Sequence, residues 1–195
     1  MFLAIDPGLN SPGVALFKSD VLIAAARIRV PDEFAEFSPG ERWCEVAQLI
    51  ARWVMTLDDI LHVVFERPQW YARGKSKGDP NQLAGVAGVA AAVCGILTGV
   101  NGDRPLISSP TPAEWIGQLS KVCPACKGKA KKKCAECRGS AWETPRGRFI
   151  RKRLSEAELA LVPDQNDAID AVGLGLFILG RLKPRSVLSN GRDGR

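Results

Sequence analysis

The chain has 195 residues, of which 46% are hydrophobic and 25% are charged, with a formal net charge of +6 at pH 7. This length suits one domain with a full hydrophobic core, because domains commonly contain about 100 to 200 residues. The charge is uneven: residues 121–153 hold twelve Lys and Arg against Glu136 and Glu143, a local charge of +10, so the remainder sums to −4. A basic tract beside an acidic body suits a protein that binds a phosphate backbone and holds metal ions, although a solvated surface loop has the same composition.

The sequence argues against secretion and against a membrane anchor. Met1 leads directly into a strand-like run without the basic segment and small-residue cleavage site of a signal peptide, so we expect a cytoplasmic protein. Residues 83–100 are uncharged and apolar, and they have nearly the length of a membrane span. They consist mainly of Ala and Gly rather than Leu, Ile and Phe, which favours a buried helix.

The N-terminal third is predicted to contain three antiparallel strands followed by a helix. The strands cover residues 2–6, 13–17 and 21–30, with tight turns between them. The helix begins after Ser38, which is followed by Pro39 at the first helical position and by Glu41 three residues on, the pattern of a capping box. Its amphipathic pattern runs to about residue 56.

The middle of the chain alternates strands with helices. We predict a strand at residues 60–66, a helix rich in Ala and Gly at 81–98, a short strand at 105–109 and a short helix at 112–119. Because the strand at 60–66 follows a helix, it can pair in parallel with residues 2–6. Strands first and alternation later indicate an α/β fold with a mixed sheet that is flanked by helices.

The last third contains a segment that breaks this pattern. Residues 121–140 have no apolar periodicity and contain four of the six cysteines, so we interpret them as an insertion in a single domain that covers residues 1–182. Beyond it we predict a basic helix at 146–160 and a last helix that is capped by Asp164 and runs to about residue 182. Residues 183–195 are rich in Arg, Ser and Gly, and we expect them to form a flexible basic tail.

Four carboxylates stand where the predicted elements bring acids together. Asp6 and Glu66 each follow an apolar strand, and parallel pairing of those strands would place them side by side. Asp167 and Asp170 lie one turn apart on one face of the last helix. Each acid also has an ordinary explanation, as a turn residue, as an ion pair with Arg67, or as an acid favoured by the helix dipole. Together, oxygen ligands in this number suit Mg²⁺ or Mn²⁺, and on a basic chain they indicate a magnesium-dependent nuclease.

Four cysteines in two C-x2-C pairs predict a structural zinc site. Cys123, Cys126, Cys134 and Cys137 have the spacing of a tetrahedral site with four thiolate ligands. Disulfide pairing is the rival interpretation, although a cytoplasmic chain seldom keeps disulfides. Five lysines lie between the two pairs, so zinc would hold a small basic finger and would have no open position for catalysis.

Basic and aromatic residues near these groups are candidates for DNA contacts. Trp70 and Tyr71 lead into Arg73, Lys75 and Lys77, and this mixture of aromatic and basic side chains suits stacking on unpaired bases, although core packing explains Trp70 equally well. Further candidates for phosphate contacts are Lys131, Lys132 and Lys133 in the finger and Arg146, Arg148, Arg151 and Lys152 before the last helix, where a solvated helix face is the alternative. His62, the single histidine, is interpreted as a core or edge residue without a catalytic role.

The order and spacing of several segments resemble the RuvC Holliday-junction resolvases. These segments are residues 2–17, 63–66, 85–92, 111–112 and 166–171, so the resemblance covers nearly the whole chain apart from 121–140 and the tail. It implies an RNase H-like fold with a five-stranded sheet, a homodimer, and paired nicking of four-way DNA junctions. Asp6, Glu66, Asp167 and Asp170 match the four catalytic carboxylates of that family, which would hold two Mg²⁺ ions about 4 Å apart.

The same resemblance implies further roles and leaves one departure. In these resolvases the segment after Glu66 carries an aromatic wedge, the region at 146–152 carries residues that contact phosphates, and the Ala/Gly helix serves dimerisation. Burial against the sheet explains the composition of that helix almost as well. The cysteine-rich insertion departs from the usual pattern, which leaves the preferred DNA shape open and suggests a bacteriophage member of the family.

Three other functions remain open at this point. The first is a nuclease of broader specificity for branched DNA or RNA. The second is a zinc-containing protein that binds nucleic acid without catalysis, against which the presence of all four acids argues. The third is an actin-like sugar kinase or ATPase, which also begins with a strand and an Asp-x-Gly turn, but this chain is too short for two lobes and shows no second phosphate loop.

Overall fold

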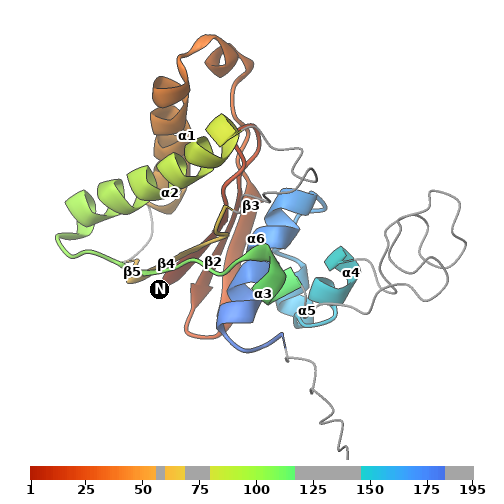
Figure 1. Ribbon diagram of the computed structural model, residues 1–195. Coiled ribbons are helices and arrows are strands. Elements are labelled where there is room, and N and C mark those ends of the chain that lie inside the picture. The colour runs from red at the N-terminus through yellow and green to blue at the C-terminus, as the bar shows by residue number, and fades with distance from the viewer. Residues whose placement is uncertain (56–59, 69–79, 117–145, 183–195) are drawn as a thin grey trace, which may run out of the picture.

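The computed structural model describes residues 1–55, 60–68, 80–116 and 146–182 (Figure 1). A five-stranded mixed sheet with the strand order β3-β2-β1-β4-β5 forms its centre. The strands are β1 (Phe2–Asp6), β2 (Gly13–Lys18), β3 (Val21–Arg27), β4 (His62–Phe65) and β5 (Leu106–Ser108). The predicted α/β fold, with three antiparallel strands first and parallel strands later, is confirmed.

The first three strands fix the position of Asp6. β1 pairs with β2 so that Asp6 lies opposite Gly13, and β2 pairs with β3 as far as Arg27. The third strand is shorter than the predicted range 21–30, because β2 begins at Gly13 and the Ile28 N–H bonds instead to the Pro12 carbonyl in the preceding turn. Asp6 is therefore the last residue of the central strand of the sheet.

β4 lies beside β1 and runs parallel to it, as predicted. The register pairs Phe2 with His62 and Ile5 with Phe65, so that Asp6 and Glu66 are the next residues along the two strands. β5 continues the parallel half of the sheet on the far side of β4. The two acids consequently emerge at the same end of the sheet, where the carboxyl ends of parallel strands meet.

Helices cover both faces of the sheet (Figure 1). One face carries α1 (Pro39–Val54) and α2 (Pro80–Asn101), and the other carries α6 (Asn166–Ile178) together with α3 (Pro112–Ile116), α4 (Arg146–Arg151) and α5 (Glu156–Leu159). The alternation of side chains along β1 accounts for the two layers. Leu3 and Ile5 join the core under α1 and α2, whereas Phe2 and Ala4 join the core under α6.

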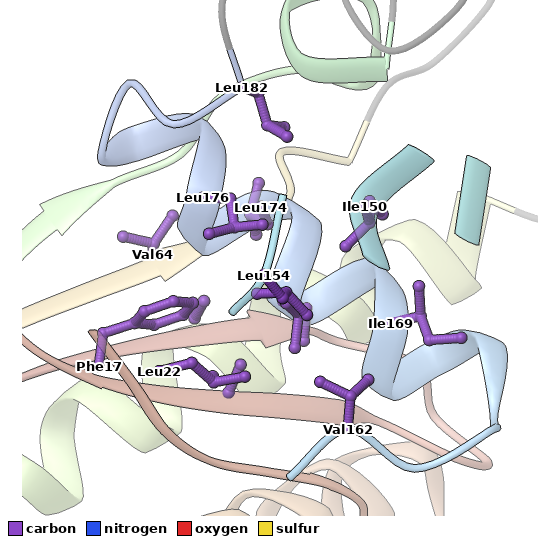
Figure 2. Close-up of a cluster of buried hydrophobic side chains, with 14 of the residues drawn as sticks. Phe17, Leu22, Val64, Ile150, Leu154, Val162, Ile169, Leu174, Leu176 and Leu182 are labelled. Atoms are coloured by element: carbon purple, nitrogen blue, oxygen red, sulfur yellow. The ribbon is translucent and has the colours of Figure 1, made fainter. Parts of the chain in front are cut away.

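The core on the α6 side is shown in Figure 2. Side chains of the sheet meet those of α6, of α4 and of the segment beyond α4; those labelled include Phe17, Leu22, Val64, Ile150, Leu154, Ile169, Leu174 and Leu176. α6 lies very close to the sheet, since a Cβ atom at Gly175 would come within 2.2 Å of the Phe17 ring. This close packing holds α6, whose first two turns carry Asp167 and Asp170, against the sheet.

The two helices of the other layer follow the prediction in most respects. α1 begins with the expected capping box, in which the Ser38 N–H donates to Glu41 Oε2 at 2.9 Å. Leu83–Val100 of α2 is long and apolar enough to span a membrane by length and composition, and 33% of it is buried. Its buried side, which includes Val89 and Val93, packs into the core with α1, whereas Ala91 on the opposite side is exposed. Burial is thus confirmed for one side of this helix only.

Three predictions for the last third are wrong. The single helix expected at 146–160 is divided into α4 and α5, because Ser155 caps a new helix and forms a capping box with Glu158. Asp164 does not cap α6, which begins after Gln165; it pairs instead with Arg151, at 2.9 Å. α6 also ends at Ile178, before Gly180 with its positive φ of 68°, and not near residue 182.

Candidate active site

The four predicted acids reach one end of the sheet from three elements. Asp6 ends β1, Glu66 follows β4, and Asp167 and Asp170 lie in the first two turns of α6. Asp6 interacts electrostatically with each of the other three, so the structure brings all four into one neighbourhood. Their assignment as metal ligands stays a prediction.

Gly13 allows α6 to approach the strand ends. A Cβ atom at this position would lie 1.8 Å from the Asp167 carbonyl oxygen, so a larger residue would force α6 away from β2. The Asp167 carboxylate is held from the same side: Ser11 Oγ donates to Asp167 Oδ2 at 3.0 Å, and Arg27 Nε lies 3.1 Å from that oxygen. The turn after β1 and the end of β3 therefore both fix Asp167.

Crowding and burial raise the proton affinity of the acids. The pKa of Asp6 is raised to about 7. Burial makes the largest contribution, and the negative charges of Asp170, Glu66 and Asp167 follow in that order. Burial also raises the pKa of Asp170 to about 6 and raises the pKa of Glu66 above its ordinary value. Repulsion between the carboxylates and their burial disfavour the charged forms, and a bound cation would offset both effects.

Trp115 holds Glu66 in place. Its indole Nε1 donates to Glu66 Oε2 at 2.7 Å, and its side chain, on α3, is 1% exposed. This bond opposes the effect of burial by lowering the pKa of Glu66. Sequence reasoning missed Trp115; the available signal was a tryptophan in a short helix that directly follows the Thr111-Pro112 turn.

Among the predicted basic residues that the structure describes, Arg146 reaches the acids. Its guanidinium donates to the Asp170 carboxylate and lies 5.8 Å from the centre of the Trp115 ring. It also lowers the pKa of Asp6, Glu66 and Asp170, against the larger effect of burial. Arg151 instead donates to Asp164 and to the Pro163 carbonyl, away from this group.

The donor set suits a hard divalent cation in its chemistry, because carboxylate oxygens are the ligands that Mg²⁺ and Mn²⁺ prefer. Among the described residues, however, no three Asp, Glu, His or Cys side chains lie close enough together to hold one metal ion. Each of three acids already has a partner. Trp115 binds Glu66, Arg27 and Ser11 bind Asp167, and Arg146 binds Asp170. A cation at this site would therefore compete with the guanidinium groups for the carboxylates.

A cleft of about 270 Å³ opens beside the two strand acids. It is lined by Asp6, Pro7, Gly8, Glu66, Pro68, Leu83, Val86 and Pro112, so the strand ends form one wall and the start of α2 another. Asp6 and Glu66 are therefore accessible from solvent through this cleft.

The remaining predicted site residues fall into two groups. Arg148 and Lys152 are exposed on and just after α4. Trp70, Tyr71, Arg73, Lys75, Lys77, Lys131, Lys132, Lys133 and the four cysteines Cys123, Cys126, Cys134 and Cys137 lie outside the described residues. His62 occupies an inter-strand position, with Nε2 2.8 Å from Ser108 Oγ on β5, which agrees with its interpretation as a structural residue.

Comparison with known proteins identifies the fold. No family model matches the sequence, and no curated protein matches it. Among solved structures, RuvC from T. thermophilus in complex with a Holliday junction substrate is similar, with a TM-score of 0.55 and 14% identity over 94% of this chain and 99% of that one. Another Thermus thermophilus RuvC structure gives a TM-score of 0.53 and 15% identity over 94% of this chain and 98% of that one. At these identities the likeness concerns the fold, and the chain has the fold of RuvC.

Proposed function

We propose that this protein is a magnesium-dependent, structure-selective DNA endonuclease that makes paired nicks in four-way junctions. The observation that carries the proposal is the meeting of Asp6, Glu66, Asp167 and Asp170 at one end of a sheet with the fold of RuvC. One of the similar RuvC structures contains a Holliday junction substrate, and the match extends over nearly the full length of both chains. A four-way junction is therefore the first substrate to test.

The four carboxylates would hold two Mg²⁺ or Mn²⁺ ions. When bound, such ions supply an activated water and stabilise charge on the leaving oxygen of a phosphodiester. The remaining work falls to the protein: Trp115 orients Glu66, whereas Ser11 and Arg27 orient Asp167. Arg146, which contacts Asp170, would turn its guanidinium to a phosphate oxygen of the substrate.

Contacts with the rest of the DNA are proposed from the sequence. Arg148, Arg151 and Lys152 would add phosphate contacts near the site, and Trp70 or Tyr71 would stack on unpaired bases at the junction centre, with Arg73, Lys75 and Lys77 beside them. Cys123, Cys126, Cys134 and Cys137 would bind structural Zn²⁺ and so present Lys131, Lys132 and Lys133 to DNA. Metal analysis of the purified protein tests the zinc assignment, which fails if no zinc is bound.

Paired nicks require two active sites, so we also propose a homodimer. The exposed side of α2 carries small residues, including Ala84, Ala87, Ala91 and Gly95, which would allow a second helix to approach closely. Sedimentation analysis of the protein alone distinguishes the dimer from a monomer.

A cleavage assay tests the proposed function directly. Purified protein with Mg²⁺ is incubated with an end-labelled four-way junction, a flap and a linear duplex of the same sequence. We expect cleavage of the junction at symmetric positions, whereas equal cleavage of linear duplex would favour the alternative nuclease of broader specificity. Asp6→Asn should remove cleavage and keep junction binding. Glu36→Gln, a change at an exposed acid of the short 3-10 helix η1 (Asp32–Glu36), should leave both cleavage and binding unchanged. Absence of cleavage on all substrates would contradict the proposal.

A further inference from the structure

A separate polar pocket lies beside the site and shares none of its four acids. It has a volume of about 510 Å³ and is lined by Asn10, Arg27, Arg29, Val30, Asp32 and Gln165. These residues come from the turn after β1, from the end of β3 and the segment beyond it, and from the residue that precedes α6. Arg27 connects the pocket to the candidate active site, because its guanidinium also contacts Asp167.

Arg27 and Arg29 give the pocket its positive charge. Ile28 and Val30 are buried, so the two arginines, which alternate with them along an extended segment, face away from the core. Arg27 uses Nε to contact Asp167 and its side chain is 48% exposed, which leaves the outer edge of the guanidinium for another acceptor. Arg29 is exposed and has no hydrogen bond or ion pair with any other described residue. A guanidinium fork of this kind matches the oxygens of a phosphate.

Asn10 lines the pocket and can supply a hydrogen-bond donor. Arg42 donates to Asn10 Oδ1, so the amide nitrogen of Asn10 remains available to donate. Gln165 adds a second amide, and its side chain makes no capping bond to α6. Asp32 is the acid of the lining, and Asp167, which lies outside the lining, already pairs with Arg27. The positive charge available to a ligand is therefore that of Arg29, which together with the amide groups of Asn10 and Gln165 favours a small anion over a cation.

We propose that this pocket binds a backbone phosphate of the nucleic-acid strand that is cut at the four carboxylates, with Arg27 and Arg29 as the principal donors. The proposal rests on the proposed function. A phosphate held beside Asp167 would fix the register of the strand and thereby decide which neighbouring phosphodiester reaches Asp6 and Glu66. Arg27 would have two roles, since it would orient Asp167 and also bind this phosphate.

The first test compares Arg29→Gln with Arg52→Gln, both in the Asp6→Asn background so that the junction is not consumed. Arg52 is an exposed arginine on α1 and does not line the pocket. We expect Arg29→Gln to weaken junction binding about tenfold near 50 mM salt and about threefold near 200 mM, because one phosphate contact and its released counterion are lost. Asp32→Asn should strengthen binding. Equal binding and equal salt dependence for Arg29→Gln and Arg52→Gln would overturn the proposal.

The second test locates the phosphate. Junctions that carry a single uncharged methylphosphonate linkage at successive positions around the cleavage point are bound to the Asp6→Asn protein and to its Arg29→Gln derivative. At one linkage the neutral analogue should weaken binding by the Asp6→Asn protein but not by the derivative, since the partner of that phosphate is already absent. If the two losses add at every linkage, the pocket does not bind the strand. If the protein binds no junction at all, the proposed function fails, which is a different outcome.

Discussion

Trp115 Nε1 donates a hydrogen bond of 2.7 Å to Glu66 Oε2, so a buried indole on α3 fixes an acid at the end of β4. Arg146 lies over the same indole ring and contacts Asp170. Trp115 thus contacts Glu66 directly and Asp170 through Arg146. Because Trp115 is buried, it binds Glu66 from the core, and Glu66 still lines the cleft.

Trp115→Phe should lower the cleavage rate by about a hundredfold, because small displacements of a positioned group cost rate even when the group itself is retained. Junction affinity should stay unchanged, since Trp115 is buried and has no direct access to DNA. The lost bond should also reduce the free energy of unfolding by about 2 kcal/mol. Single-turnover cleavage, filter binding and urea unfolding measure the three quantities. Trp53→Phe on α1 is the matched control, and an equal loss of cleavage there would remove Trp115 from this role.

The raised pKa of Asp6 predicts an unusual dependence of stability on pH without metal. The pKa of this acid is about 7 in the folded protein against an ordinary value of 3.8, so between these values the folded state binds more protons than the unfolded state. The free energy of unfolding should therefore fall as pH rises from about 4 to about 7. Thermal melts in chelator across this range measure the effect. Mg²⁺ should raise the melting temperature more at pH 8 than at pH 5, and Asp6→Asn should flatten the chelator profile; an unchanged profile would contradict the shift.

Glu158 should be the most important acid for stability. It is 4% exposed and accepts from Arg181 at 2.7 and 2.8 Å and from the Leu22 N–H at 2.9 Å, so it joins α5, β3 and the segment after α6. These bonds hold the pKa of Glu158 well below its usual range. Glu158→Gln should cost about 3 kcal/mol at neutral pH, because Arg181 loses its charge partner.

The stabilisation by Glu158 should also depend on pH in a defined direction. A lowered pKa in the folded state stabilises the protein above the ordinary pKa of about 4.5, and this contribution is lost as pH falls below it. Urea unfolding at several pH values should therefore show that the difference between wild type and Glu158→Gln narrows in acid. Glu156→Gln, at an exposed acid of the same helix, is the control and should show little difference at any pH.

Gly13→Ala should separate α6 from the sheet at its N-terminal end. The added methyl group would overlap the Asp167 carbonyl, which is backbone and cannot turn aside. We expect a loss of at least about 2 kcal/mol of stability and a loss of cleavage larger than the stability change explains. Gly40→Ala, where a Cβ atom meets nothing within 4 Å, should be tolerated. Equal behaviour of the two variants would show that the close approach at Gly13 is not required.

The sequence was sufficient for the features that depend on local pattern. The capping box of Ser38 with Glu41, the strand–turn–strand run from Phe2 and the parallel pairing of β4 with β1 all follow from periodicity and chain-crossing rules. These rules are sufficient to predict that Asp6 and Glu66 lie at the same end of the sheet.

Partners distant in the sequence could not be predicted in the same way. Trp115 and Glu66 are 49 residues apart, and no periodicity relates them; the same holds for Arg27 with Asp167. The division of the expected helix at 146–160 was different, because Ser155 and Glu158 have the spacing of a capping box, a local signal that outweighs the basic helical pattern around it.

The distribution of the four acids along the chain also has a consequence for biosynthesis. Asp6 and Glu66 leave the ribosome with the first part of the sheet, whereas Asp167 and Asp170 arrive only with α6, after 165 other residues have been made. A nascent chain consequently carries half of the acids and none of the packing that Gly13 and Gly175 permit. Under the proposed function, cleavage would begin only after translation of the last helix, and an incomplete chain would not cut nucleic acid near the ribosome.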